Sequence, residues 1–245
     1  MDQQDSSGPL FGVKFLEKMD ETPEFRSTPS NARLMIAISG IPGSGKTELA
    51  SVMARRVNQI YTSEKPGPAP IATAIPMDGY HLTRAQLAQM PDPEYAAARR
   101  GAAFTFDGGK FLELAQSLRR EITAETPNLY APSFDHAIKD PVENDIAIPP
   151  TCRVIFFEGN YLSLNREPWS TAAKVMDELW FVDVDFEIAR KRLVRRHLQA
   201  GLAKTEEEAD KRATENDLVN GKEIVDNRLD VQEIVVSHYD PAWER

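Results

Sequence analysis

The chain has little that could anchor it in a membrane or link it covalently. Among its 245 residues, the longest uninterrupted apolar run is the five residues from Leu34 to Ile38, far short of the roughly 20 needed to cross a bilayer. Cys152 is the only cysteine, so no intrachain disulfide is possible, which fits a reducing compartment. The first ten residues contain two aspartates and neither a basic residue nor an apolar stretch, which argues against a signal or transit peptide. We predict a cytoplasmic protein and leave a nuclear location open.

Excess positive charge is also missing. Lys and Arg number 29 and Asp and Glu number 38, which gives a formal net charge of −9. A surface of this sign does not attract a nucleic-acid backbone or an anionic membrane, so neither is expected as a partner. A small anion can still bind in a local basic pocket. The hydrophobic content of 41% and the charged content of 27% are typical of a globular protein, and the length suits one α/β domain.

Residues 1–32 are polar and contain three prolines, so we expect an N-terminal leader ahead of a domain at residues 33–245. Two interpretations of this leader remain open. It is either disordered or contains one amphipathic helix that packs on the body, because five apolar residues fall near helical spacing. These residues are Leu10, Phe11, Phe15, Leu16 and Met19.

From Arg33 onward, short apolar runs alternate with longer amphipathic stretches. Strands are predicted at residues 34–39, 70–77, 153–158, 179–184 and 233–237, and helices at 46–60, 83–90, 108–122, 167–178, 186–199 and 206–217. The strand sequences are continuously apolar, as expected of strands covered on both faces. This alternation predicts an α/β fold with a mostly parallel sheet between helices.

Residues 40–47 read Gly-Ile-Pro-Gly-Ser-Gly-Lys-Thr and match the phosphate-loop pattern G-x-x-x-x-G-K-[ST]. Glycines allow the backbone to turn its N–H groups toward phosphates, the lysine supplies a charge, and the threonine hydroxyl can bind Mg²⁺. The motif follows a predicted strand and opens a predicted helix, as this mechanism requires. The residues expected at the nucleotide are Gly40, Gly43, Ser44, Gly45, Lys46 and Thr47.

Asp78 follows the second predicted strand, at the sheet edge where ligands of parallel sheets bind. A carboxylate there would repel phosphates unless it has a function. It could take the proton of an acceptor hydroxyl, or orient that hydroxyl and the Mg²⁺ shell. The alternative is that Asp78 only caps the next helix. The N-K-x-D element of guanine-binding proteins and the S-G-G-Q signature of ABC-type ATPases are absent from the sequence.

Several segments together resemble one known superfamily: residues 40–47, 77–81, 99–107, 132–136, 157–162 and 215–221. The chain is similar, from residue 33 to about residue 240, to the phosphoribulokinase, uridine kinase and pantothenate kinase superfamily. Within it, the chain resembles fungal uridine-kinase-like proteins and bacterial kinases linked to fructose transport. The resemblance implies a three-layer P-loop fold, a five-stranded parallel sheet of order 2-3-1-4-5 and a helical lid at about residues 190–213.

The same resemblance implies roles for individual residues, with ATP and Mg²⁺ as cofactors. Asp78 would be the catalytic carboxylate, and Glu158 a second acidic group behind Mg²⁺ unless it only caps its strand. Asn216 and Asn220 would contribute to nucleotide binding. The acceptor pocket would draw on Tyr80, His81, Arg100, Phe104, Asp107, His136 and Tyr161. An aromatic residue at such a place is as compatible with core packing as with substrate contact.

Five basic residues fall within residues 190–196 of this acidic chain. Arg192 and Arg196 lie four residues apart and therefore on one helical face. Over the nucleotide they could stabilise charge on the transferred phosphoryl group, so we predict both as catalytic residues of the lid. Two alternatives remain: a solvated face paired with the acidic residues 206–208, and a nucleic-acid patch.

These observations predict an ATP-dependent kinase that transfers the γ-phosphoryl group to a hydroxyl of a small metabolite. A nucleoside such as uridine is preferred as acceptor, with a pantothenate-like compound or a sugar as alternatives. The competing hypothesis is a regulatory P-loop module that hydrolyses ATP slowly and has no acceptor. The sequence leaves open whether the protein is a monomer or a homodimer.

Overall fold

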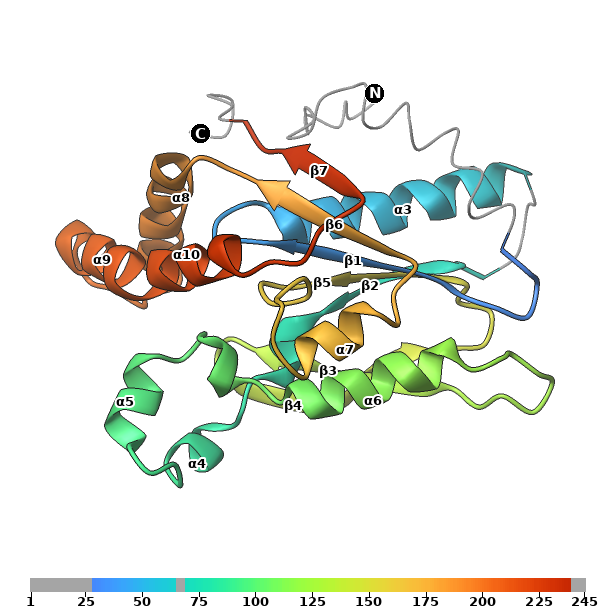
Figure 1. The fold of residues 1–245 in the computed structure, drawn as a ribbon, viewed down its shortest axis with the longest axis horizontal. Coiled ribbons are helices and arrows are strands. Elements are labelled where there is room, and N and C mark those ends of the chain that lie inside the picture. The colour runs from blue at the N-terminus through green and yellow to red at the C-terminus, as the bar shows by residue number, and fades with distance from the viewer. Residues whose placement is uncertain (1–27, 65–68, 239–245) are drawn as a thin grey trace, which may run out of the picture.

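The computed structural model describes residues 28–64 and 69–238 (Figure 1). The possible leader helix around residues 10–19 lies outside these ranges. Contacts with the folded body begin slightly before the predicted domain start at Arg33, because the backbone N–H of Ile122 donates to the carbonyl of Asn31 at 2.7 Å.

Five parallel strands form the main sheet in the order β2-β5-β1-β6-β7. Numbered as these five strands occur along the chain, this is the predicted order 2-3-1-4-5, which is confirmed. The strands β1 and β5 are buried along their whole length, which explains their continuous apolar sequences. The strand bounds are Leu34–Gly40 (β1), Ala72–Pro76 (β2), Val154–Glu158 (β5), Glu178–Asp183 (β6) and Glu233–Val236 (β7).

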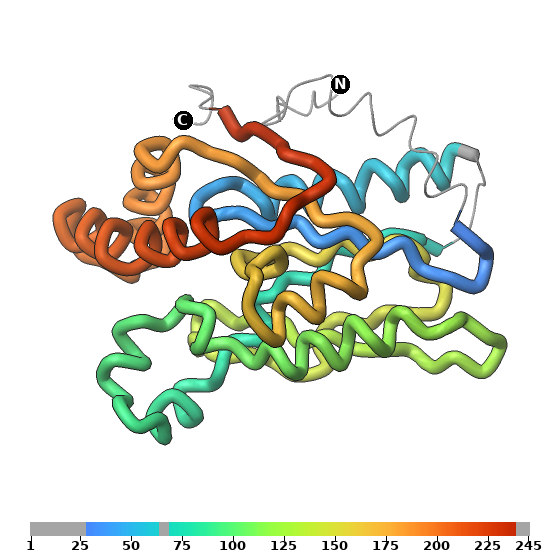
Figure 2. The backbone as a smooth tube through the Cα atoms, in the orientation of Figure 1, coloured from blue at the N-terminus to red at the C-terminus, as the bar shows by residue number. Residues whose placement is uncertain are grey.

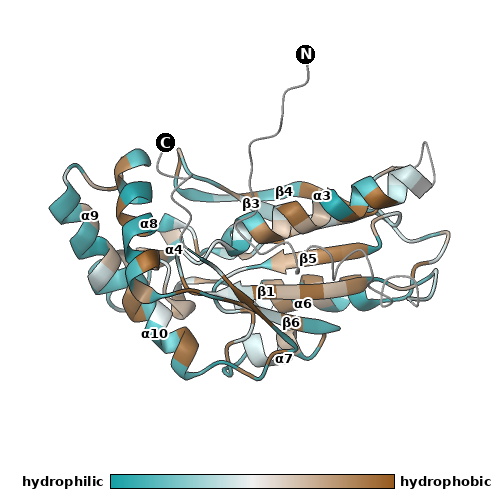
Figure 3. Cartoon of the chain, turned by 90° about the horizontal axis from the view of Figure 1, so that it is seen from above, coloured by the Kyte–Doolittle hydropathy of each residue, from teal (hydrophilic) through white to brown (hydrophobic). Residues whose placement is uncertain are grey.

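Helices cover both faces of this sheet, so the fold has the predicted three layers (Figure 1). In β1, Ile36 and Ile38 belong to the core under α3, whereas Met35 and Ala37 belong to the core that contains α6 and α7. Side chains of a strand alternate between its two faces, which produces this division. Hydrophobic and hydrophilic residues alternate along α3 in Figure 3, as expected of a helix with one buried face. These helices span Lys46–Glu64 (α3), Gly108–Arg119 (α6) and Trp169–Ala173 (α7).

Three further helices lie together beyond the end to which β6 and β7 point (Figure 2). They are α8 (Phe186–Gln199), α9 (Glu206–Arg212) and α10 (Leu218–Asp226). The helix predicted at 206–217 consists of α9 and one π-helical segment, Ala213–Asp217 (η3), and continues directly into α10. The sequence analysis predicted neither the π-helical segment nor α10. Thr205 caps α9 by accepting from the N–H of Glu208. No helix in the described ranges is long and apolar enough to span a bilayer.

An antiparallel hairpin that the sequence analysis did not predict packs beside the main sheet. It consists of β3 (Leu129–Asp135) and β4 (Asp140–Ile148). Its close approach to the turn after β2, η1 (Met77–Tyr80), requires a glycine, since a Cβ on Gly79 would lie 2.1 Å from the carbonyl oxygen of Pro132. The segment before the hairpin holds α4 (Arg84–Leu87), α5 (Pro93–Ala98) and the short 3₁₀ turn η2 (Ala103–Thr105). The helix predicted at 83–90 is thus a single turn.

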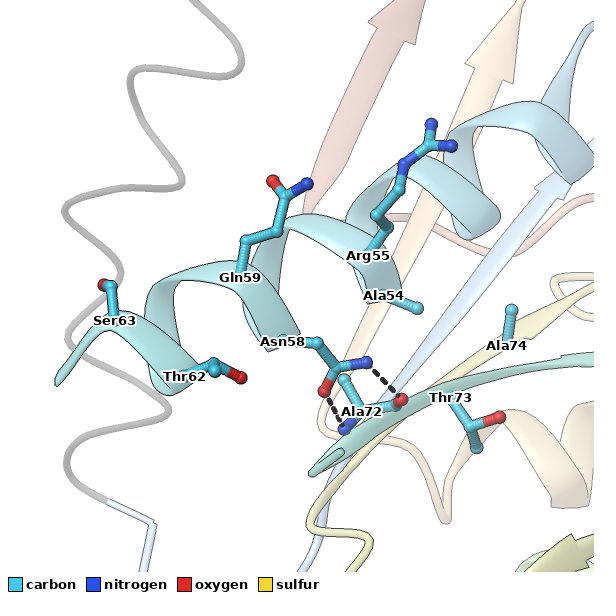
Figure 4. Close-up of a pocket in the computed structure, with 9 residues that line it drawn as sticks. All are labelled: Ala54, Arg55, Asn58, Gln59, Thr62, Ser63, Ala72, Thr73 and Ala74. Atoms are coloured by element: carbon cyan, nitrogen blue, oxygen red, sulfur yellow. Dashed lines mark hydrogen bonds between the residues drawn. The ribbon is translucent and has the colours of Figure 1, made fainter. Parts of the chain in front are cut away.

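The outer edge of β2 is partly closed by α3. Asn58 accepts from the backbone N–H of Ala72 and donates to the carbonyl of Ala72 (Figure 4). It also accepts from the backbone N–H of Ile71. An open groove beside Asn58 is lined by the later part of α3 and by residues 72–74. This groove lies toward the amino end of β2, whereas ligands of parallel sheets bind at the carboxyl ends.

Candidate active site

The phosphate loop connects β1 to α3 at the carboxyl edge of the sheet. Gly43 and Gly45 have φ angles of 80° and 95°, a region that favours glycine. A Cβ on Gly40 would lie 2.7 Å from Ser44 Oγ and 2.9 Å from the carbonyl oxygen of Val182, so glycine is required there for close packing. The first N–H groups of α3 have no partner within the helix, and together with the helix dipole they provide an anion site.

Thr47 and Glu158 meet at this site. Thr47 Oγ1 donates to Glu158 Oε2 at 3.1 Å, and Glu158 is 6% exposed at the end of β5. Burial raises the pKa of Glu158 to about 7, and the charge of Lys46 opposes the shift. Burial also disfavours the charged form of Lys46 and so lowers its pKa, and the carboxylates of Glu158 and Asp78 oppose that shift. Lys46, Glu158 and Asp78 therefore form one electrostatic cluster.

Asp78 lies in η1, two residues beyond Pro76, which is the register partner of Glu158 in the sheet. Its side chain is 50% exposed, so it can reach a ligand. The interpretation of Asp78 as a helix cap does not hold for α4, because Thr83 is the residue that caps that helix. His81 Nδ1 forms a hydrogen bond with the backbone carbonyl of Asp78 at 2.8 Å and lies 4.0 Å from Asp78 Oδ1.

A cluster of rings continues from His81 to the hairpin. The ring of His81 lies 4.0 Å from that of Phe106 and 4.8 Å from that of Phe134, between centroids. His136 is 5.2 Å from Phe134, and the guanidinium of Arg100 is 5.4 Å from the same ring. Of the predicted acceptor residues, the structure thus brings together His81, Arg100 and His136. Phe106 and Phe134 are additions; both lie in segments that carry the family resemblance, but neither was singled out.

Arg100 links the two walls of this cluster. It donates to the backbone carbonyls of Lys139 and Leu82 and to Asp140 Oδ1, the last at 3.2 Å. Asp140 also accepts from the backbone N–H of Arg84 at 2.8 Å. The hairpin is therefore fixed against the chain segment that follows Asp78.

The other predicted acceptor residues make structural contacts. Tyr80 is buried with its ring edge against Phe111. Tyr161 is fully buried, and its hydroxyl donates to the carbonyl of Gly101. Asp107 caps α6. Phe104 is 43% exposed and stacks on Tyr95, with 5.8 Å between ring centroids.

Asn216 and Asn220 are buried and contact Arg99. Arg99 donates to Asn216 Oδ1 at 2.8 Å and to Asn220 Oδ1 at 2.6 Å, while Asn216 Nδ2 donates to the carbonyl of Arg100. These bonds tie the π-helical segment and α10 to residues 99–101. In this arrangement the side-chain oxygens of both asparagines are occupied by a protein partner.

The basic residues of α8 face in different directions. Arg192 donates to the carbonyl of Gly43 at 3.1 Å, so it contacts the back of the phosphate loop. Arg196 is exposed, and its charge acts on Lys46, Glu158 and Asp217. Arg190 pairs with Asp210 of α9 at 2.6 and 2.7 Å, so an ion pair joins α8 to the helix that also carries residues 206–208. Of the two arginines predicted as catalytic, Arg196 is therefore the one whose charge acts on Lys46 and Glu158.

The residues at the phosphate loop are suited to holding a Mg²⁺ ion together with a nucleotide. No group of three or more His, Cys, Asp or Glu side chains in the described part of the chain is arranged to hold a metal ion. Mg²⁺ with a nucleotide needs no such group, because it is held by one or two carboxylates, water and the phosphates. Thr47 and the buried Glu158, in contact with each other, supply a hydroxyl and a carboxylate at the phosphate loop.

The fold and this site define the protein as a P-loop kinase. It is 60% identical over 163 residues to the ATP-dependent kinase-like protein notR' of Aspergillus versicolor, a match that covers 66% of this chain and 95% of the relative. It is 44% identical over 188 residues to the "Putative uridine kinase C227.14" of Schizosaccharomyces pombe, over 77% of this chain and 76% of the relative. The crystal structure of YFH7 from Saccharomyces cerevisiae shares the fold, with a TM-score of 0.81 and 24% identity over 93% of this chain and 100% of the other. No protein-family model matches the chain.

The chain therefore belongs to the family of these ATP-dependent, uridine-kinase-like proteins, as its motifs indicate.

Proposed function

We propose that this kinase transfers the γ-phosphoryl group of ATP to a hydroxyl of a small metabolite, with a nucleoside such as uridine as the preferred acceptor. The observation that carries the proposal is the position of Asp78, which is half exposed, interacts electrostatically with Lys46 and Glu158, and lies next to the ring cluster of His81, Phe106 and Phe134. A regulatory module has no need of an accessible carboxylate beside such a cluster. The name of the Schizosaccharomyces pombe relative favours the nucleoside over a pantothenate-like compound or a sugar.

Each residue near the phosphate loop has a role in this proposal. The amides of the loop and Lys46 bind the β- and γ-phosphates. Asp78 orients the acceptor hydroxyl and takes its proton. Thr47 and Glu158 would hold Mg²⁺, which when bound neutralises phosphate charge. Arg196 stabilises the charge of the moving phosphoryl group, since it faces this cluster from α8.

Two further predictions belong with this function. The helical lid comprises residues from about 190 to 213, and the kinase domain extends over residues 33–245. The buried, unpaired Cys152 agrees with the proposed cytoplasmic location.

The function can be tested by incubating the purified protein with ATP, Mg²⁺ and panels of nucleosides, vitamins and sugars. We expect a product whose mass has increased by one phosphoryl group in one panel, and ADP release that this acceptor stimulates. The Lys46→Ala variant should form no product. A slow ADP release that no panel changes would support the regulatory module instead.

A further inference from the structure

Arg192 contacts the phosphate loop through the loop's backbone carbonyl groups. Its Nη1 donates to the carbonyl oxygens of Gly43 at 3.1 Å and Ser44 at 3.4 Å. The same nitrogen donates to Ser237 Oγ at 3.0 Å, and Nη2 donates to the carbonyl of His238 at 2.8 Å. One guanidinium therefore joins the loop to the chain that follows β7.

The carbonyl groups of the loop determine where its amides point. A trans peptide is planar, so its C=O and N–H groups point in opposite directions. The carbonyl of Gly43 shares a peptide with the N–H of Ser44, which closes the turn by donating to Ile41. The carbonyl of Ser44 shares a peptide with the N–H of Gly45. A cation that holds both carbonyls therefore fixes the turn and directs the Gly45 amide away from Arg192, toward the side on which phosphates bind.

The backbone of α8 lies directly against the same loop. A Cβ on Gly43 would lie 2.8 Å from the carbonyl oxygen of Ala189 and 3.2 Å from the side chain of Leu193. Ala189 and Leu193 are fully buried. Arg192 follows on the same face of the helix, so its position relative to the loop is set by packing.

The other end of the contact is also fixed. Ser237 is 3% exposed, and its backbone N–H donates to the carbonyl of Asp183 at the end of β6 at 2.8 Å. Its hydroxyl oxygen is thus a fixed acceptor for Arg192. Burial lowers the pKa of Arg192, yet an arginine side chain stays charged, so its hydrogen bonds remain charge-assisted.

We propose that Arg192 is a positioning residue for the nucleotide, which holds the phosphate loop in its binding geometry and couples it to the end of β7 through Ser237 and His238. This role rests on the proposed function, because it assumes that the nucleotide is ATP. It differs from the lid role predicted for Arg192 from the sequence, in which the guanidinium would contact the transferred phosphoryl group.

The test is the affinity of the full chain for Mg²⁺-ATP, measured by titration calorimetry. Arg192→Ala should weaken ATP binding by about ten- to a hundredfold, the range set by losing hydrogen bonds from a charged donor. Arg192→Lys should recover part of this loss, and Ser237→Ala should show a smaller one. Lys191→Ala is the matched control: its side chain is exposed and lines an outer groove of α8 with Glu187 and Leu198, so its affinity should equal that of the wild type.

A second measurement separates positioning from a merely structural contribution. Melting temperatures without nucleotide report on stability alone, and Arg192→Lys and Ser237→Ala remain informative if Arg192→Ala does not fold. If these variants melt lower but bind ATP like the wild type, the proposed role is wrong. Unchanged ATP affinity with a reduced rate of phosphoryl transfer would restore the lid role and equally overturn the proposal. A wild type that does not bind ATP would overturn the proposed function itself, a distinguishable result.

Discussion

Asp78 and Glu158 lie at neighbouring strand ends but differ in their surroundings. Glu158 is 6% exposed and accepts a hydrogen bond from Thr47, whereas the side chain of Asp78 is 50% exposed and faces the ring cluster. A carboxylate that contacts the phosphate-loop threonine is placed to hold Mg²⁺ beside the phosphates, and an accessible carboxylate can come within hydrogen-bond reach of an acceptor hydroxyl. The two carboxylates are therefore suited to different tasks.

This difference leads to a prediction for Asp78→Asn, which keeps the size of the side chain but cannot accept a proton. Acceptor phosphorylation should fall by about 10²- to 10⁴-fold, the usual contribution of a general base. ATP should still bind, because the substitution removes a charge that repels phosphates. Product mass measures the first effect and calorimetry the second. Full activity of the variant would exclude Asp78 from catalysis, and loss of both properties with recovery at high Mg²⁺ would indicate a metal ligand.

Lys46 serves the ligand more than the fold. Because its charge binds the β- and γ-phosphates, Lys46→Ala should abolish ATP binding. Burial disfavours the charged form of Lys46, as its lowered pKa indicates. The variant should therefore leave the unfolding temperature of the nucleotide-free chain unchanged or slightly raised. Calorimetry with ATP and thermal unfolding without it measure the two effects. ATP turnover at the native rate in this variant would mean that the loop does not bind the nucleotide phosphates.

At the scale of elements, the buried parallel strands β1 and β5 could be predicted because each contains a continuous apolar run. The strand β4 could not: its sequence, DPVENDIAI, is polar and half exposed, and it is stabilised by contacts with η1 and the residues around Arg100. The phosphate loop and Asp78 were found because their patterns are local. The contact of Arg192 with Gly43 spans 149 positions, so no local pattern indicates it. Tyr80, next to Asp78, was predicted to bind the acceptor but packs into the core.

The hairpin is fixed by Asp140, whose carboxylate accepts from Arg84 and Arg100. Burial acts to raise its pKa, but the hydrogen bonds from Arg84 and Arg100 outweigh this and lower it. A carboxyl group with a lowered folded-state pKa stabilises the fold above its unfolded pKa, and this contribution is lost as the pH falls through the folded pKa.

We therefore expect Asp140→Asn to reduce stability by about 1–2 kcal/mol at neutral pH and by progressively less as the pH falls below the ordinary aspartate range. Urea unfolding of both proteins at pH 7 and near pH 3 measures this difference. An equal difference at both pH values would show that the charge of Asp140 does not stabilise the hairpin.

At the scale of the whole molecule, Arg99 connects the two sides of the active site. Arg99 begins the segment of residues 99–106, which ends at Phe106 in the ring cluster. The N–H of Leu82 donates to the carbonyl of Thr105 in this segment. The guanidinium of Arg99 holds Asn216 and Asn220, in the helical region whose Asp217 acts electrostatically on Lys46. The acceptor side and the helices beyond the sheet are thus joined through the Arg99 side chain, together with the bond from Asn216 to the Arg100 carbonyl.

The contacts of Arg99 allow two roles of Asn216 and Asn220 to be distinguished. The asparagines either bind the nucleotide, as the family resemblance implies, or support the acceptor side. Should they support the acceptor side, Arg99→Ala and Asn220→Ala would each reduce acceptor phosphorylation, and the double variant would lose less than the sum of the single losses because the residues share a contact. ATP affinity would stay within about twofold of the wild type, since neither altered side chain would then contact the nucleotide. Should the asparagines bind the nucleotide, Asn220→Ala would weaken ATP binding and Arg99→Ala would not, because it leaves both amides in place. Calorimetry with ATP on the three variants decides between the two, and Arg99→Lys, which keeps the charge but cannot reach both asparagines at once, is the control for charge alone.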